Sequence, residues 1–202
     1  MQARSLQRDD EAEKCFVEAI KLYPQGDFLY TSRADFYKEE GKFDLALADV
    51  RKAVSLSGGS LENHKKLADM LDMLGRLDEA LVEYDYVLAR QKTDFRTLLR
   101  KAQALKRMKR YAQSAYAFGL ASQAGANEEN IVEAMSGEAE MYFAAKDDTK
   151  SLASFERLIK KYPMVSRGYW GRAKLYDRLK KADLAKADRK KAEELDLSLG
   201  TL

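Results

Sequence analysis

The chain has 202 residues, of which 34% are charged and only two are proline, and its formal net charge is +3. So small a basic excess argues against a nucleic-acid binder, because positive charge supplies most of the affinity for phosphates. One cysteine, Cys15, excludes an internal disulfide, and no apolar run is long enough to span a bilayer. Helix-forming residues are frequent and no stretch alternates polar and apolar residues, so we expect an all-α fold.

A pattern of small and bulky residues recurs along the chain at a period of 34 residues, except for one interval of 37 that has three extra residues in the connection at 125–130. In one register a small residue precedes a bulky one by three positions; the small residues are Ala34, Ala68, Ala102, Ala139 and Ala173, and the bulky ones are Tyr37, Leu71, Leu105, Tyr142 and Tyr176. In a second register, mostly large residues stand at Phe16, Val50, Tyr84, Phe118, Phe155 and Arg189. Small residues let two helix backbones approach, and bulky ones fill the groove between them. Each period therefore predicts a hairpin of two helices.

Between the two helices of a pair, the first two complete periods carry Gly41 and Gly75. Glycine at this place ends a helix with a positive φ. The later periods carry Lys109, Lys146 and Lys180 there, so we expect the same turn to accept a side chain.

This period and pattern resemble the tetratricopeptide repeat, most clearly over residues 27–46 and 75–80. The resemblance implies an all-α, right-handed superhelical solenoid of tandem antiparallel helix pairs, with about 5.5 repeats. It also implies a protein-binding scaffold. The sequence has no glycine-rich phosphate loop, no Cys/His metal pattern and no nucleophile paired with a base, so we expect neither an enzyme nor a cofactor.

In chain order, we expect one array with a partial repeat over 1–26, containing a single helix near 8–22. Complete repeats follow over 27–60, 61–94, 95–131, 132–165 and 166–196, with a short tail over 197–202. The helix near 8–22 has too few residues before it for a partner helix, so its apolar face should be open. Either the sequence is part of a longer protein, or this end docks on another copy.

The first helix of each pair lines the concave wall of such an array. The basic residues that we place on the middle of this wall are Lys65, Lys66, Arg96, Arg100 and Arg107, with Gln103 between them. Guanidinium groups one helical turn apart can bind carboxylates bidentately; alternatively these charges only solvate an exposed helix. Arg96 and Arg100 match the two basic places of the clamp with which some family members bind a chaperone tail. Thr31, Asp35 and Lys66 do not match its other places.

The second candidate site surrounds Trp170, the only tryptophan, which follows Tyr169 at a packing position. Gly171 and its counterpart Gly137 carry no side chain, so the wall beside Trp170 is expected to be bare, and Lys174 lies one turn further on. Such an arrangement predicts a pocket for an apolar anchor. The alternative is that Trp170 packs on a neighbouring helix or on the tail, with the glycines relieving crowding. The other residues placed on this wall include Glu140, Phe143 and Arg167.

We expect a packing role for two remaining residues. His64 stands at a bulky position of the repeat, and Cys15 lies among apolar residues, where we expect it to be an inert packing residue. The first functional hypothesis is a scaffold that binds a protein or peptide in the concave groove, where the basic residues favour an acidic ligand. The alternative is a structural module that self-associates through exposed terminal helices. We expect no nucleic-acid partner and no membrane span. Residues 1–10 show no signal peptide, which, with the missing disulfide pair, favours the cytoplasm without deciding the compartment.

Overall fold

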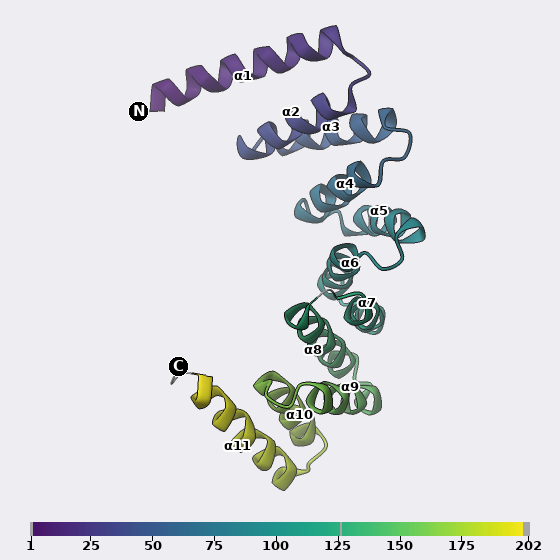
Figure 1. Ribbon diagram of the computed structural model, residues 1–202, viewed down its shortest axis with the longest axis vertical. Helices are drawn as coiled ribbons and strands as arrows, with labels where there is room; N and C mark the ends of the chain where they lie inside the picture. Colours follow the sequence, from purple (N-terminus) through teal and green to yellow (C-terminus); the bar gives the residue numbers. More distant parts are fainter. Residues whose placement is uncertain (1, 126, 200–202) are drawn as a thin grey trace. The chain divides into compact units, whose positions relative to one another are not determined.

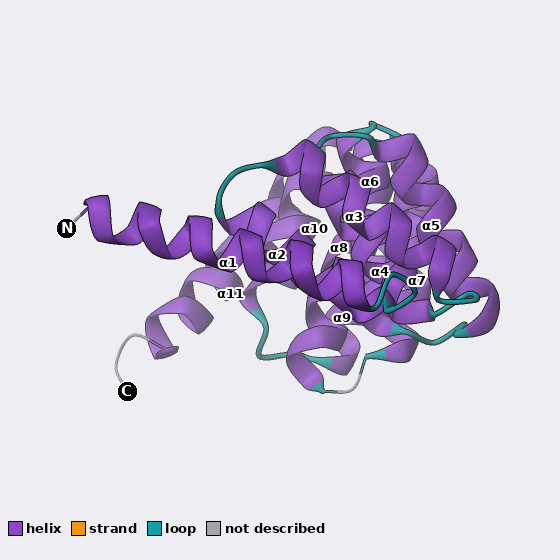
Figure 2. Ribbon diagram, turned by 90° about the horizontal axis from the view of Figure 1, so that it is seen from above, coloured by secondary structure: helices purple, strands orange, loops and turns teal. Residues whose placement is uncertain are grey.

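The computed structural model describes the backbone of residues 2–125 and 127–199, and the side chains of residues 10–125 and 127–197. Within these ranges every regular element is an α-helix, and short loops connect the helices (Figures 1 and 2). The helices are α1 (Gln2–Leu22), α2 (Asp27–Glu39), α3 (Phe43–Leu56), α4 (Leu61–Met73), α5 (Leu77–Arg90), α6 (Phe95–Arg107), α7 (Tyr111–Ala124), α8 (Glu128–Ala144), α9 (Asp148–Lys161), α10 (Ser166–Arg178) and α11 (Ala182–Leu199). The predicted all-α class is confirmed.

The helices form two compact units, residues 1–90 with α1–α5 and residues 91–202 with α6–α11. In the second unit, α6, α8 and α10 lie on one side and α7 and α9 on the other (Figure 1). This alternation follows from hairpins that stack on one another, since the first helices of consecutive pairs face the same way.

Both terminal helices are longer than the sequence pattern predicted. α1 begins at Gln2 instead of near residue 8, and α11 continues to Leu199, past the predicted repeat end at residue 196. The physical reason is local, because neither extension contains a glycine or a proline that would interrupt the helix.

The recurring small residues form the contacts between helices. All five alanines of the first-helix register are fully or almost fully buried, and so are the second-helix residues Ala53, Val87, Ala121, Leu158 and Ala192. Buried alanines let the helix backbones approach closely, so that dispersion contacts accumulate along the interface. Within each unit the buried residues therefore recur once per repeat.

Two second helices carry serine where the others carry alanine at a buried position. Ser114 Oγ donates a hydrogen bond of 2.7 Å to the carbonyl oxygen of Ala102, and Ser151 Oγ donates one of 3.1 Å to that of Ala139. In both cases the acceptor lies twelve residues earlier, in the first helix of the same pair. Because the hydroxyl has a partner, serine is accepted here without the cost of an unsatisfied buried polar group.

The turn inside each hairpin has the same backbone conformation whether it holds glycine or lysine. The φ angles are 72° at Gly41 and 75° at Gly75, and they are 58°, 60° and 58° at Lys109, Lys146 and Lys180. The residue after each one donates its amide hydrogen to the carbonyl five residues earlier, which closes the helix end. The prediction that this turn accepts a side chain is confirmed.

Two equivalent ion pairs tie the first helix of a hairpin to the second. Arg33 donates two hydrogen bonds of 2.7 Å to Asp49, and Arg172 donates two of 2.8 Å to Asp188. The spacing is sixteen residues in both pairs, and each carboxylate is at least nine-tenths buried. Paired Arg–carboxylate groups of this geometry fix the relative orientation of two helices.

Candidate binding cleft in the second unit

Four residues of α10 share one helix face at spacings of three and four. They are Arg167, Trp170, Gly171 and Lys174. Residues at these spacings lie above one another on a helix. The sequence therefore places the tryptophan, the glycine and two cations on a single stripe.

This stripe forms one side of a cleft of about 290 Å³, which α8 and α9 complete. The residues that line it are Glu140, Met141, Phe143, Phe155, Arg167, Trp170, Gly171 and Lys174. The structure thus brings together the predicted residues Trp170, Gly171 and Lys174. A cleft with mainly apolar and aromatic walls and a few polar groups is typical of ligand sites.

The floor of the cleft is apolar because the backbone of α10 lies directly on an aromatic ring. Phe155 and Met141 are buried, and a Cβ built on Gly171 would stand only 2.1 Å from the Phe155 ring. At Gly137 a Cβ would meet the ring of Phe118 at 2.7 Å, and Gly137 is not among the residues that line the cleft. Both glycines therefore allow close approach of an aromatic ring. This agrees with the alternative interpretation of the sequence, in which the glycines relieve crowding.

The two aromatic walls are each held by polar contacts. Trp170 Nε1 donates a hydrogen bond of 2.9 Å to Asp196 Oδ2 on α11. On the other wall, the guanidinium carbon of Arg178 lies 3.7 Å from the centre of the Phe143 ring, and the same guanidinium bonds the Phe143 carbonyl oxygen and Asp148. A guanidinium over the face of an aromatic ring is attracted to it electrostatically.

Charge at the rim of the cleft is mostly positive. Arg167 and Lys174 are exposed cations, and Glu140 is the exposed carboxylate among the lining residues. Behind Trp170, the Ser166 hydroxyl and then the indole N–H lower the pKa of the Asp196 carboxyl by hydrogen bonding. Trp170 therefore has a hydrogen-bond acceptor on α11.

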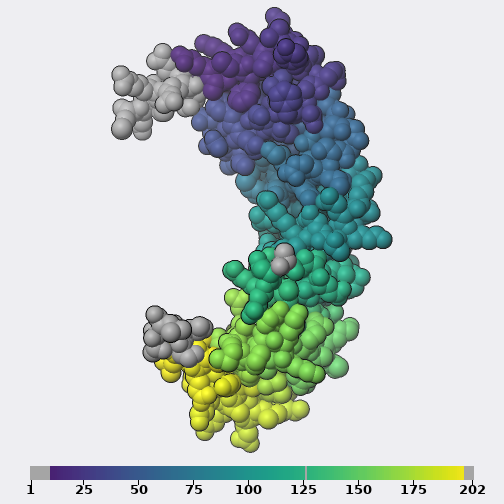
Figure 3. Space-filling view, in the orientation of Figure 1, coloured from purple at the N-terminus to yellow at the C-terminus, as the bar shows by residue number. Residues whose placement is uncertain are grey.

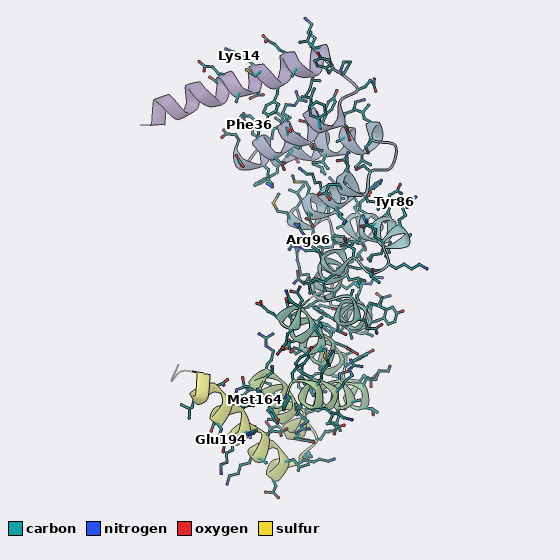
Figure 4. All side chains as sticks on the ribbon, in the orientation of Figure 1. Lys14, Phe36, Tyr86, Arg96, Met164 and Glu194 are labelled. Atoms are coloured by element: carbon teal, nitrogen blue, oxygen red, sulfur yellow. The ribbon has the colours of Figure 1, made fainter. Side chains whose placement is uncertain are left out.

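The predicted basic residues of α6 also lie in the second unit. Arg96, Arg100, Gln103 and Arg107 follow one another at spacings of four and three, so they share a face of that helix. The three arginines are exposed and Gln103 is half-buried; Arg96 is labelled in Figure 4. This face of α6 is polar and basic, and α6 itself contains no acidic residue.

Lys65 and Lys66 belong to α4 in the first unit, and each is half-buried. Lys66 Nζ donates a hydrogen bond of 2.7 Å to Asp35 of α2. Part of its charge is thus compensated within its own unit, a contact that the helical pattern alone did not indicate.

Two single residues that the sequence assigned to packing differ in outcome. His64 is buried, its ring stacks on Tyr86 with centres 3.6 Å apart, and its Nδ1 lies 2.6 Å from Glu83, so a packing role is confirmed. Cys15 is exposed, which corrects the expectation that it is buried filler. The reason is that α1 packs chiefly against α2, through neighbours of Cys15 such as Phe16, whose ring centre lies 5.8 Å from that of Phe36.

Two parts of the site were not predicted from sequence. Met141 and Phe155 occupy packing positions, and they line the cleft because a packing residue can also be its floor. Asp196 lies 26 residues from Trp170, in the last repeat, and no local pattern relates them. The sequence shows only that a carboxylate lies near the end of the last helix. The packing of α11 on α10 brings this carboxylate to Trp170.

Among the residues with described side chains, no cluster of three or more His, Cys, Asp or Glu is arranged to hold a metal ion. Within the same part of the chain, no helix is both long and apolar enough to cross a membrane.

Comparison with known proteins agrees with this architecture. Residues 29–59 match the family model of the tetratricopeptide repeat. The chain is 35% identical over 66 residues to the rat (Rattus norvegicus) E3 ubiquitin-protein ligase TTC3, and 34% identical over 71 residues to the STIP1 homolog of Dictyostelium discoideum. These alignments cover 33% and 35% of this chain, and only 3% and 13% of the two relatives.

Solved structures resemble the chain over most of its length. The C-terminal part of a repeat protein from Cytophaga hutchinsonii matches with a TM-score of 0.74 and 19% identity, covering 97% of this chain and 77% of that one. MamA from Desulfovibrio magneticus matches with a TM-score of 0.68 and 17% identity, over 85% and 96% of the two chains. YrrB, described as having an unusual peptide-binding site, matches with a TM-score of 0.68 and 16% identity, over 93% and 98%.

Residues 29–59 thus match a tetratricopeptide repeat, and the chain shares its fold with solved repeat proteins over most of its length. Proteins built from this repeat in general mediate protein–protein interactions.

Proposed function

We propose that the chain is a scaffold that binds an extended segment of a partner protein, with one apolar side chain of that segment in the cleft between α8, α9 and α10. The observation that carries the proposal is the apolar floor of Phe155 and Gly171 beneath two fixed aromatic walls, Trp170 and Phe143. An apolar anchor buried in a preformed pocket is the usual centre of an interaction surface. The peptide-binding site named for the similar YrrB structure makes a peptide ligand a reasonable expectation for this fold.

We propose further that the segment carries carboxylates next to its apolar residue. The rim carries two cations, Arg167 and Lys174, and one carboxylate, Glu140. Electrostatic attraction to a negatively charged ligand therefore exceeds the repulsion. Arg96 and Arg100 on α6 offer a second place for carboxylates in the same unit, with Gln103 and Arg107 on the same face. Lys65 and Lys66 of the first unit remain candidates for an acidic ligand by charge type alone.

Selection from a random peptide library, followed by binding titrations of the selected peptides, tests the proposal. We expect the selected peptides to share an apolar residue beside Asp or Glu. Lys174→Glu should weaken their binding by about tenfold, as expected for a rim charge of the wrong sign. Lys186→Glu is the matched control, since Lys186 is an exposed lysine on α11 outside the cleft. Peptides that bind the Lys174→Glu and Trp170→Ala variants as tightly as the parent chain would overturn the proposal.

A second candidate function, self-association through α1, has one observation in its favour. Ala12, Phe16 and Ala19 of α1 are only half-buried, whereas their counterparts in α3, Ala46, Val50 and Ala53, are almost completely buried. Partly exposed apolar rows of this kind are found at protein contacts. Sedimentation over a range of concentrations tests this candidate, and a monomer at every concentration in the micromolar range would exclude it.

A further inference from the structure

One hydrogen bond connects the wall of the cleft to the last helix. Trp170 Nε1 on α10 donates to Asp196 Oδ2 on α11 over 2.9 Å. α10 and α11 pack side by side, as the light green and yellow side chains in Figure 3 show. Asp196 lies two residues beyond Glu194, which is labelled in Figure 4. The Asp196 carboxylate thus accepts a hydrogen bond from the face of α10 that lines the cleft.

We infer that Asp196 is the positioning residue that holds the Trp170 indole as a wall of the cleft, so that the last turn of α11 controls the shape of the binding site. The inference rests on the proposed function of the cleft and adds its regulation. Any event that moves the last turn of α11 would then change the cleft without touching its floor.

The chemistry of the indole explains why one acceptor matters. Trp170 is only half-buried, so its ring has space for other rotamers on the side that faces solvent. Its N–H is a donor with no acceptor capacity, and the hydrogen bond to the Asp196 carboxylate favours the rotamer that makes it. A wall that is already in place spares a ligand the cost of ordering it.

The attachment of α11 does not depend on Asp196. Arg172 and Asp188 join α10 and α11 by two hydrogen bonds of 2.8 Å, and Ala185, Ala192 and Leu195 are buried along the helix. Replacing Asp196, which is exposed, removes none of these contacts. The position of the indole and the folding of α11 can therefore be tested separately.

The experiment uses Trp170 as its own reporter, because the chain contains no other tryptophan. Fluorescence anisotropy and acrylamide quenching are measured on the full chain and on Asp196→Ala, Asp196→Asn and Glu193→Ala. Asp196→Ala should raise the quenching constant and lower the anisotropy. Asp196→Asn keeps an oxygen acceptor and should restore most of both values. Glu193→Ala, another exposed carboxylate of α11, should behave as the parent chain.

Titration with peptides selected on the parent chain completes the test. Asp196→Ala should weaken their binding by about three- to tenfold, the effect of leaving one side chain to be ordered on binding, and Asp196→Asn by less. Unchanged quenching and anisotropy in Asp196→Ala would overturn the inference, and so would a mobile indole with undiminished peptide affinity. Failure to select any peptide on the parent chain would instead count against the proposed function, while the fluorescence still decides whether Asp196 positions the indole.

Discussion

Gly171 and Phe155 touch so closely that no side chain fits between them. A Cβ at Gly171 would stand 2.1 Å from Phe155 Cε1 and 2.4 Å from Cζ, well inside van der Waals contact. Phe155 is itself only 1% exposed, so other atoms surround its ring. The contact sets the distance between α9 and α10 and forms the floor of the cleft at the same time.

Gly171→Ala should therefore destabilise the second unit. The added methyl group must displace the buried ring or the α10 backbone, and such overpacking costs roughly 1–3 kcal/mol. Chemical denaturation followed by circular dichroism measures the change. Lys174→Ala, one turn further on the same face and exposed, is the control and should change stability by less than about 0.5 kcal/mol. Equal stabilities of Gly171→Ala and the parent chain would show that this contact is loose in solution.

Lys146→Gly should stabilise the chain. Lys146 has a φ of 60°, where a side chain is strained and glycine is not. Relief of this strain exceeds the extra freedom of glycine in the unfolded chain, so we expect a gain of about 0.5–1 kcal/mol. Gly75→Ala introduces the same strain at an equivalent turn, where φ is 75°, and should have the opposite sign. Thermal unfolding of the two variants checks the prediction, and a loss of stability in Lys146→Gly would contradict it.

Glu138 should make stability depend on pH. Its carboxyl is buried against α9, and this burial raises its pKa, while the charge of Arg157 and a 3.4 Å hydrogen bond from Ser154 oppose the shift. Because the pKa of Glu138 is higher in the folded than in the unfolded chain, the protonated carboxyl favours the folded state. This contribution to the free energy of unfolding is fully present below the usual glutamate pKa and is lost as pH rises through the raised pKa of the folded state.

Glu138→Gln mimics the protonated form and removes this dependence. The variant should be more stable than the parent chain near neutral pH, and the advantage should shrink as pH falls towards the usual glutamate value. Unfolding curves at several pH values measure the difference. Glu140→Gln, an exposed neighbour on α8, should show no comparable trend. A difference that grows as pH falls would have the wrong sign and would contradict the prediction.

Replacing Arg96 and Arg100 together by alanine should weaken the binding of acidic peptides. Loss of hydrogen bonds to charged groups costs roughly 1–3 kcal/mol. Isothermal titration with the selected peptides measures this loss, and the parent affinity itself should fall as salt rises. A variant with Lys186 and Lys190 of α11 replaced by alanine removes the same charge elsewhere and should bind normally. Unaltered binding by the α6 variant would remove these arginines from the proposed site.

The sequence by itself determined the repeating part of this protein. The pairs Ala34 and Tyr37, and Ala139 and Tyr142, are each three residues apart. Their place on one helix face depends only on the local sequence, because residues three or four apart share a helix face whatever surrounds them. Hence the helical class and the buried positions followed from the 34-residue period, and so did the common turn at Gly41 and Lys146. The same local reasoning placed Trp170, Gly171 and Lys174 on one stripe of α10.

Only the tertiary structure decided what that stripe faces. A missing side chain at Gly171 is equally consistent with an open wall and with a close neighbour, and the distance to Phe155 selects the second. Likewise, Asp196 reaches Trp170 only because α11 folds back along α10, bringing together residues 26 positions apart. Contacts between helices depend on the volumes of all the side chains between them, which no single period of the sequence contains. The shared face of Trp170, Gly171 and Lys174 could therefore be predicted from the sequence, whereas the cleft depends on how α8, α9 and α10 pack together.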